Sequence, residues 1–461
     1  MVIKQKTKPQ NAKTKKQKKK RLCINIIYLY NIYMFLTLEN FLSYFPKKNI
    51  TKEEFSNKLK IMYKTSYTLD ELFSLKHKTV IKDKTDIRYI RRNEIIDYFY
   101  DIIIDNRHKY LSLWYNSHFK FINPKDLKWD NISLELKSPT NERIISTQKN
   151  DNSKHMIRSL FYLELFDYTK ITNTVKNHVS FWNSLLNMYN KLELEDRFFA
   201  KSSIELLLKD KNTLREKSSG IKERNYNILF YLYQQYQPKA SIFNPYTIKY
   251  ILTDIILPLS GSQNKKDMKL LSPVLSWGSY LPAFMHSDNY SHYVGIDVMK
   301  SVCDKVKKFG IWYNNELNTN KKIDIVCSPS EKLNNTKFTT KYNNYFDTII
   351  ICPPYYDMEI YHEGPQSIKS YKSYDEWLEK YWGGTIELCH KVSKTNTIFA
   401  VIANNYFSLD KKMFPLVQDF HKITSKYFTL IDTIYLQNRT SPLRVNNKDR
   451  MERLLIYKSK N

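Results

Sequence analysis

The spacing of apolar residues along the 461-residue chain changes near residue 237. Before that point, apolar side chains recur three and four positions apart, which is the spacing of one face of an α-helix. The pattern predicts helices over residues 51–63, 91–104, 154–168, 179–192 and 225–235. Thr51 and Thr68 each precede a glutamate by three residues, which predicts capping boxes at two helix starts. The first half of the chain is therefore expected to be mainly helical.

Beyond Gln237 and Pro238, short apolar runs alternate with helical stretches. The runs cover residues 269–274, 293–296, 322–327, 345–351, 397–403, 427–436 and 453–457. Strands that alternate with helices predict right-handed crossovers and a mostly parallel sheet, here of about seven strands. Ligands of such sheets bind beyond the carboxyl ends of the strands, so we expect the chemistry just after each run.

Length and pattern together predict three parts. A chain of 461 residues exceeds what one hydrophobic core usually supports. Residues 1–21 contain ten Lys or Arg and no acid, which predicts a disordered basic tail. Residues 22–237 are expected to form a mainly helical domain, and residues 238–461 an α/β domain.

The net charge of +28 favours a polyanionic partner, and nucleic acid is the first candidate. Removing the ten charges of the tail leaves +18, so the excess extends through the rest of the chain. Compositional drift is an equally weighted explanation. Lys, Asn, Ile and Tyr are abundant and Gly is scarce, as in translation from an AT-rich genome, and the lysines would then only aid solubility.

The cysteines predict neither a disulfide framework nor a metal site. There is no C-x-x-C pair and no zinc-finger spacing among Cys23, Cys303, Cys327, Cys352 and Cys389. We therefore expect a reducing, intracellular environment and no metal. The apolar run at residues 22–36 is shorter than the ~20 residues of a membrane span and contains two Asn. We expect a buried strand or helix there, without membrane association or secretion.

The most informative stretch is 346–361, FDTIIICPPYYDMEIY. Its apolar run ends at Pro353 and Pro354, which lack N–H donors and so cannot continue a central strand. The chain must leave the sheet in a rigid turn that presents Tyr355. A proline-terminated strand with a surface tyrosine is one reading. The stretch also resembles the motif of S-adenosylmethionine-dependent amino-methyltransferases, in which Asp, Asn or Ser precedes Pro-Pro-Tyr.

That resemblance implies a role for each residue of the turn. Cys352 stands at the position of the Asp, Asn or Ser, and Pro353 supplies a carbonyl; in the family these two groups accept hydrogen bonds from the target amino group. Tyr355 would stack on the target base, which leaves a duplex at a cost of ~a few kcal/mol. A thiol is a weak acceptor compared with a carboxylate. Asp357 or Glu359 is therefore expected to take over the polarising role.

A second stretch, 270–281, reads LLSPVLSWGSYL and resembles the glycine turn of the same family, where a strand enters a helix. Pro273, Trp277 and Gly278 match the family pattern. Ser272 stands where an aspartate is usual, and Ser276 replaces a glycine. The resemblance implies that this turn surrounds the methionine part of the cofactor.

Three further signals complete the family order, in which a segment at 241–257 precedes the glycine turn, and the ribose acid and the adenine contact lie between that turn and Pro-Pro-Tyr. Asp297 ends a run about 20 residues after the glycine turn, where an acid accepts both ribose hydroxyls; a helix-cap aspartate is the alternative. Ser330 and Glu331 match a contact to the adenine amino group, with a loop cap as the alternative. The residues that match the segment covering the methionine end are Phe243, Asn244 and Pro245.

Two stretches lie beyond the Pro-Pro-Tyr turn. Residues 356–377 resemble methyltransferases assigned to phages and large DNA viruses, in which a loop like Gln366-Ser367 overhangs the target pocket. Helix caps and core aromatics explain Tyr374 and Trp377 more simply. Residues 438–453 are rich in Arg and Lys and predict either a hairpin with phosphate contacts or a solvated basic turn.

These signals predict a Rossmann-like class I methyltransferase sheet with an N-terminal mainly helical domain. The expected reaction is methyl transfer from S-adenosylmethionine to adenine N6 or cytosine N4 in DNA, with RNA as the second candidate acceptor. The helical half is expected to recognise the nucleic acid. Departures at Ser272, Ser276 and Cys352 also fit a catalytically degenerate nucleic-acid-binding protein or a partner subunit. Methylation of a protein side-chain amide is a third hypothesis. The enzyme hypothesis requires Asp297 and the turn at 353–355 to open onto one cleft.

Overall fold

The structure is a computed structural model that describes residues 35–61, 96–97, 99–129, 133–136, 142–147, 152–167, 181–194, 242–358, 361, 364–408, 412–437 and 451–460. Several expectations fall outside these residues. They are the basic tail at 1–21, most of the buried element expected at 22–36, the capping box at Thr68, the helix at 225–235, most of the basic stretch at 438–453, and Glu359.

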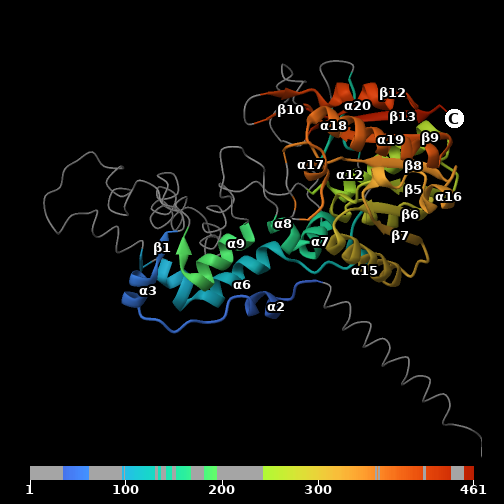
Figure 1. The fold of residues 1–461 in the computed structure, drawn as a ribbon. Coiled ribbons are helices and arrows are strands. Elements are labelled where there is room, and N and C mark those ends of the chain that lie inside the picture. The colour runs from blue at the N-terminus through green and yellow to red at the C-terminus, as the bar shows by residue number, and fades with distance from the viewer. Residues whose placement is uncertain are drawn as a thin grey trace, which may run out of the picture.

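A nine-stranded sheet forms the centre of the second half of the chain (Figure 1). Each predicted run is a strand: β5 (Met268–Ser272), β6 (Tyr290–Asp297), β7 (Lys322–Cys327), β8 (Phe346–Ile351), β9 (Ser393–Ala403), β12 (Phe428–Gln437) and β13 (Glu452–Ser459). The spatial order is β2-β3-β12-β13-β9-β8-β5-β6-β7. Within the seven strands only β13 is antiparallel to its neighbours, so the predicted mostly parallel α/β class is confirmed.

The path of the chain through the sheet creates a crevice. From β5 the chain moves to β6 and β7 on one side, then returns to β8 and β9 on the other. The connections that leave β5 and β8 therefore diverge at the carboxyl ends of these two strands. In open α/β sheets this reversal of strand order is where ligands bind.

Alternate residues of the strands feed two cores, one on each face of the sheet. Leu270 and Ile350 belong to one core, and Leu271 and Ile351 to the other. The first face is covered by α12 (Pro245–Tyr250), a π-helical turn (Ile251–Ile256), α13 (Leu257–Ser260), α14 (Tyr280–Met285) and α15 (Lys300–Leu317). The second is covered by α16 (Lys337–Lys341), α18 (Tyr374–Trp377), a π-helical turn (Leu378–Trp382), α19 (Gly383–Val392) and α20 (Leu416–Thr424).

The first half of the chain is largely helical over its described residues. Its helices are α2 (Leu38–Ser43), α3 (Lys52–Lys58), α6 (Arg107–His118), α7 (Asn152–Leu160), α8 (Tyr162–Asp167) and α9 (Phe181–Leu186). A separate aromatic core, which includes Phe41, Trp114 and Trp182, holds several of them together. The capping box at Thr51 is confirmed, because its side chain and that of Glu54 each bond to the other's backbone N–H.

Part of this first half packs into the sheet domain. The short strands β2 (Glu135–Leu136) and β3 (Ile144–Ser146) extend the sheet beyond β12. Ile145, Met156 and Phe161 are fully buried in the core of the first face. The boundary at residue 237 stays a prediction, but strands and a helix from well before it complete the sheet domain.

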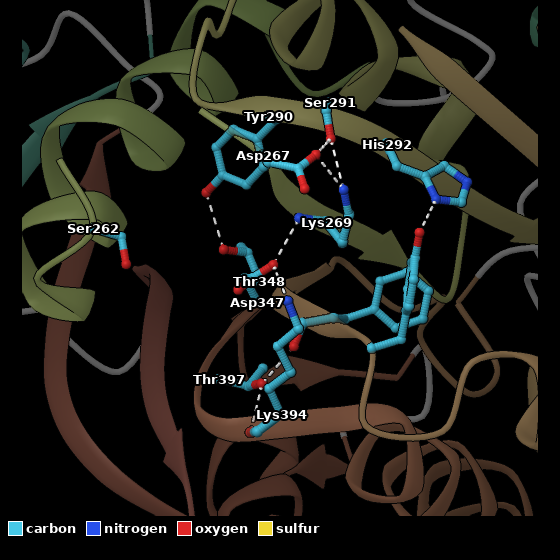
Figure 2. Close-up of polar contacts among 12 residues, drawn as sticks. Ser262, Asp267, Lys269, Tyr290, Ser291, His292, Asp347, Thr348, Lys394 and Thr397 are labelled. Carbon is cyan, nitrogen blue, oxygen red and sulfur yellow. Dashed lines mark hydrogen bonds and ion pairs between the residues drawn. The ribbon is translucent and has the colours of Figure 1, made fainter. Parts of the chain in front are cut away.

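A polar network occupies the amino-terminal rim of the sheet (Figure 2). Asp347 on β8 accepts hydrogen bonds from the backbone N–H of Lys269, at 2.9 Å, and from Nζ of Lys394, at 2.9 Å. Asp267 accepts one from Ser291, at 2.6 Å, and pairs with Lys269. These bonds tie together the starts of β5, β6, β8 and β9. The charges at this rim therefore support the sheet, and the opposite rim carries the cavity described below.

Candidate active site

A cavity of about 570 Å³ lies at the carboxyl rim of the sheet. It is of the size expected for a small-molecule site. Asp297, from the end of β6, and the turn at 353–355, after β8, both line it. The predicted site residues that line it are Phe243, Trp277, Asp297, Ser330, Glu331, Cys352, Pro353, Pro354 and Tyr355. The shared cleft that the enzyme hypothesis requires is therefore present.

The glycine turn after β5 has an unusual backbone. Ser276, Trp277 and Gly278 have φ angles of +47°, +57° and +71°, which lie in the left-handed region. For residues with a Cβ this conformation costs about 1–2 kcal/mol each. A Cβ on Gly278 would lie 3.0 Å from Val306 and 3.3 Å from Phe161, so close packing also favours glycine there. The turn holds its strained backbone against the cavity.

The carboxylate of Asp297 accepts hydrogen bonds from two backbone N–H groups. Its Oδ1 accepts a hydrogen bond from the N–H of Met299, at 3.0 Å, and its Oδ2 accepts one from Leu275, at 3.3 Å. Burial raises the pKa of Asp297 to about 6, although these N–H groups oppose the rise. The second bond links the end of β6 to the glycine turn. Asp297 does not cap α15, whose N-cap Met299 has no side-chain capping bond.

Glu331 and Ser330 follow β7 and are held by α19 and the loop before α18. Tyr371 donates a hydrogen bond to Glu331 Oε1, at 2.9 Å, and burial raises the pKa of Glu331. The hydroxyls of Ser330 and Thr385 lie 2.9 Å apart. Gly384 permits this approach, because a Cβ there would lie 2.9 Å from the Cβ of Glu331.

Tyr355 lines the cavity and is stacked on a second tyrosine. Its ring lies 5.4 Å from that of Tyr406, with an interplanar angle of 19°, and Tyr406 stacks in turn on Phe414. The hydroxyl of Tyr406 donates to Asp357 Oδ1, at 2.7 Å. Asp357 does not line the cavity. Its carboxylate holds the Tyr406 ring that stacks on Tyr355. This position differs from the polarising role expected of Asp357.

Three other predicted residues support the cavity without lining it. Pro245 is the first residue of α12 and follows Asn244, whose side chain accepts the N–H of Tyr246 at 2.9 Å. Ser272 is buried, with its Oγ 2.8 Å from the carbonyl of Val274. Gly278 sets the turn described above. Glu359 lies outside the described residues.

The loop expected to overhang the pocket does line the cavity. Tyr361, Gln366 and Ser367 are among its lining residues. Gln366 is buried and its Oε1 accepts the N–H of Tyr361, at 2.8 Å. The ring of Tyr361 meets that of Trp277 edge to face, with centroids 5.6 Å apart. Tyr361 therefore packs against the glycine turn.

Other lining residues were not predicted. Val298, Met299 and Pro329 lie within two residues of the predicted Asp297 or Ser330 and could have been found from the ends of β6 and β7. Sequence reasoning gave no signal for three that come from distant segments and carry polar or charged groups: Thr147, Lys154 and Glu452.

The described part of the chain contains neither a metal-ligand cluster nor a candidate membrane span. Its His, Cys, Asp and Glu side chains form no group of three or more that could hold a metal ion. Among the described helices, none combines the length and apolar character needed to cross a membrane.

No protein-family model matches the sequence, and no curated protein matches it. Solved structures similar to this one include the N-methyltransferase NodS from Bradyrhizobium japonicum WM9 with S-adenosyl-L-homocysteine, at 11% identity and a TM-score of 0.30, covering 47% of this chain and 89% of that one. TrmN from Thermus thermophilus has 11% identity and a TM-score of 0.28, covering 45% and 48%. The [4+2]-cyclase SpnF has 13% identity and a TM-score of 0.30, covering 45% and 79%.

Proposed function

We propose that this protein transfers a methyl group from S-adenosylmethionine to an exocyclic amino group of a nucleic-acid base, adenine N6 or cytosine N4, in DNA rather than RNA. The observation that carries the proposal is the shared cavity, lined by Asp297 on one side of the strand-order reversal and by Pro353–Tyr355 on the other. The methyl-donor residues and the acceptor residues of the family motif would thus face one space.

The donor side of the cavity fits the cofactor chemically. The Asp297 carboxylate can accept hydrogen bonds from a ribose diol, and Glu331 can accept one from an adenine amino group. Val298, Met299 and Pro329 provide apolar contacts for a purine ring. When bound, S-adenosylmethionine would supply an electrophilic methyl group on a positively charged sulfur.

The acceptor side fits a planar amino base. The two prolines fix the backbone after β8, so the carbonyl of Pro353 has a set direction. Tyr355 lines the cavity with its ring held by stacking on Tyr406, and an aromatic ring in this position is suited to stack on a base. A hydrogen bond from the target NH2 to the Pro353 carbonyl would orient the nitrogen lone pair toward the methyl donor. The net charge of +28 supports a nucleic acid as the carrier of that base.

A catalytically degenerate nucleic-acid-binding protein is the second candidate. The observation that favours it is Cys352, a weak acceptor that lines the cavity at the position of the family's Asp, Asn or Ser. Such a protein would keep the net positive charge and the fold but would not catalyse methyl transfer.

The test combines calorimetry with S-adenosylmethionine and mass spectrometry of nucleosides from a host that expresses the protein. We expect a clear binding isotherm and a methylated adenine or cytosine in the host nucleic acid. Tyr355→Ala should abolish the modified base but bind the cofactor as the wild type does, because the ring serves the acceptor. Tyr355→Phe keeps the ring and is the matched control. Cofactor binding without methylated base would favour the degenerate protein, and no binding would sink the proposal.

A further inference from the structure

Glu452 is a carboxylate of the cavity that the family motif does not include. It is the first residue of β13. Because β13 runs antiparallel to β9, its first residue lies at the carboxyl rim of the parallel strands. The register places Ile351 beside Val401 and Val401 beside Leu455. Glu452 therefore lies at the rim, two strands away from the turn at 353–355.

Glu452 also shares a face of the sheet with Cys352. Leu454 is buried in the core of the first face, and Cys352 packs against that same core. Side chains two residues apart on a strand point to the same face, so Glu452 points as Leu454 does. Its partner across the ladder, Leu436, is buried in this core too. The register and the alternation together bring the Glu452 carboxylate to the acceptor side of the cavity.

Three carboxylates from described residues line the cavity, and two of them accept hydrogen bonds from other groups of the protein. Asp297 accepts two backbone N–H groups, and Glu331 accepts the hydroxyl of Tyr371. Within the described part of the chain, the side chain of Glu452 takes part in no hydrogen bond or ion pair. Its carboxylate is thus left to interact with a ligand.

The surroundings of Glu452 suit a group that exchanges a proton near neutral pH. Burial raises its pKa to about 7. Apolar side chains such as Ile242 and Phe243 line the same cavity. The charged and titratable groups that line it with Glu452 are Lys154 from α7, Asp297 after β6, Glu331 after β7, Cys352 and Tyr355 after β8, and Tyr361 and Tyr381.

We propose that Glu452 performs the task that the family motif gives to the residue at position 352. Its carboxylate would accept a hydrogen bond from the target NH2 and then take a proton from it. In this step the N–CH3 bond forms as the S–CH3 bond breaks, and the sulfur keeps the electron pair and becomes neutral. The nitrogen becomes cationic and gives one proton to Glu452, which later releases it to solvent. This inference rests on the proposed methyl transfer.

The experiment compares the full-length wild type with Glu452→Gln, Glu452→Asp and the control Glu387→Gln. Glu387 is on α19, pairs with Lys391 and does not line the cavity. We expect Glu452→Gln to lower kcat by about 10²–10⁴-fold, the usual contribution of a positioned proton acceptor. Cofactor binding by calorimetry should be unchanged, because Glu452 serves the acceptor. Glu452→Asp should restore part of kcat, and Glu387→Gln should match the wild type.

The pH profile separates this role from a structural one. With saturating cofactor, wild-type kcat should rise with pH through about 7 as Glu452 ionises, and the Gln variant should lose this step. An unchanged kcat and pH profile in a Gln variant that methylates normally would overturn the inference and leave the proposed function intact. Absence of cofactor binding in the wild type would overturn both.

Discussion

At the scale of single residues, Asp297 combines a supporting role with the cofactor-binding role proposed for it. Burial raises its pKa to about 6, so the folded state holds the proton more tightly than the unfolded state does. Its contribution to stability is therefore full below its unfolded pKa of 3.8, declines as pH rises to about 6, and is constant above that. At neutral pH the protein keeps a charge that does not favour folding, as expected of a ligand-binding carboxylate.

Asp297→Asn should therefore separate binding from stability. Cofactor affinity should fall by about 10–100-fold, the value of hydrogen bonds to a charged acceptor. The free energy of unfolding at pH 7.5 should change by less than about 1 kcal/mol, because removal of a buried charge offsets the loss of one of the two backbone hydrogen bonds that the carboxylate accepts. Wild-type affinity should also weaken as the pH is lowered through about 6, and the Asn variant should lack this dependence. Calorimetry and urea unfolding measure these quantities, and a destabilised variant with wild-type affinity would contradict the binding role.

Ser276 carries backbone strain that a glycine would relieve. Its φ is +47°, in a turn where the family has glycine. Ser276→Gly should raise the free energy of unfolding by about 0.5–1 kcal/mol, because the left-handed cost falls more than the entropy of the unfolded chain rises. Cofactor affinity should be equal or higher. Ser279→Gly, at a right-handed position two residues beyond Trp277, is the control and should destabilise the protein. Urea unfolding of both variants would settle this.

At the scale of elements, the junction of α7 and α8 braces the glycine turn. Phe161 lies between these helices, is fully buried, and its ring centroid is 6.4 Å from that of Trp277. Lys305 of α15 contacts the same junction through the carbonyl of Leu160, at 3.3 Å, and through Glu164, at 2.8 Å. A segment of the first half of the chain thus fixes the turn that would hold the cofactor.

Phe161→Leu should weaken cofactor binding as well as stability. We expect a loss of about 1 kcal/mol in the free energy of unfolding, typical of a modest change in a packed core. Affinity should fall several-fold, because the turn loses its support. Phe41→Leu, in the separate aromatic core, is the matched control and should cost similar stability without changing affinity. Equal affinities in the two variants would argue against a brace.

The strands could be predicted because each is a short apolar run closed by polar or proline residues. The runs at 345–351 and 453–457 show this well, since each agrees with β8 or β13 within a few residues. Strands β2 and β3 were not predicted. They have two and three residues, too few to show an alternation, and β12 positions β3 through long-range pairing.

At the scale of the whole molecule, the residues of the site also divide into those that the local sequence predicts and those that long-range strand pairing positions. Asp297 and Pro353–Tyr355 could be predicted because Asp297 is the last residue of an apolar run and Pro353 comes two residues after the end of another. Glu452 and Thr147 could not, because their place beside the cavity depends on the order and direction of strands far apart in the chain. The polarising role expected of Asp357 required its side chain to point into the cavity. Its carboxylate instead accepts a hydrogen bond from the hydroxyl of Tyr406.

The polar network at the amino-terminal rim has a practical consequence for protein engineering. Asp267, Asp347 and Lys394 join strand starts on the side of the sheet away from the cavity, and none of them lines it. Thermostability and turnover can therefore be tuned through different sets of positions. Ion pairs rebuilt at that rim would move the melting temperature, and the residues that contact ligand would remain as they are.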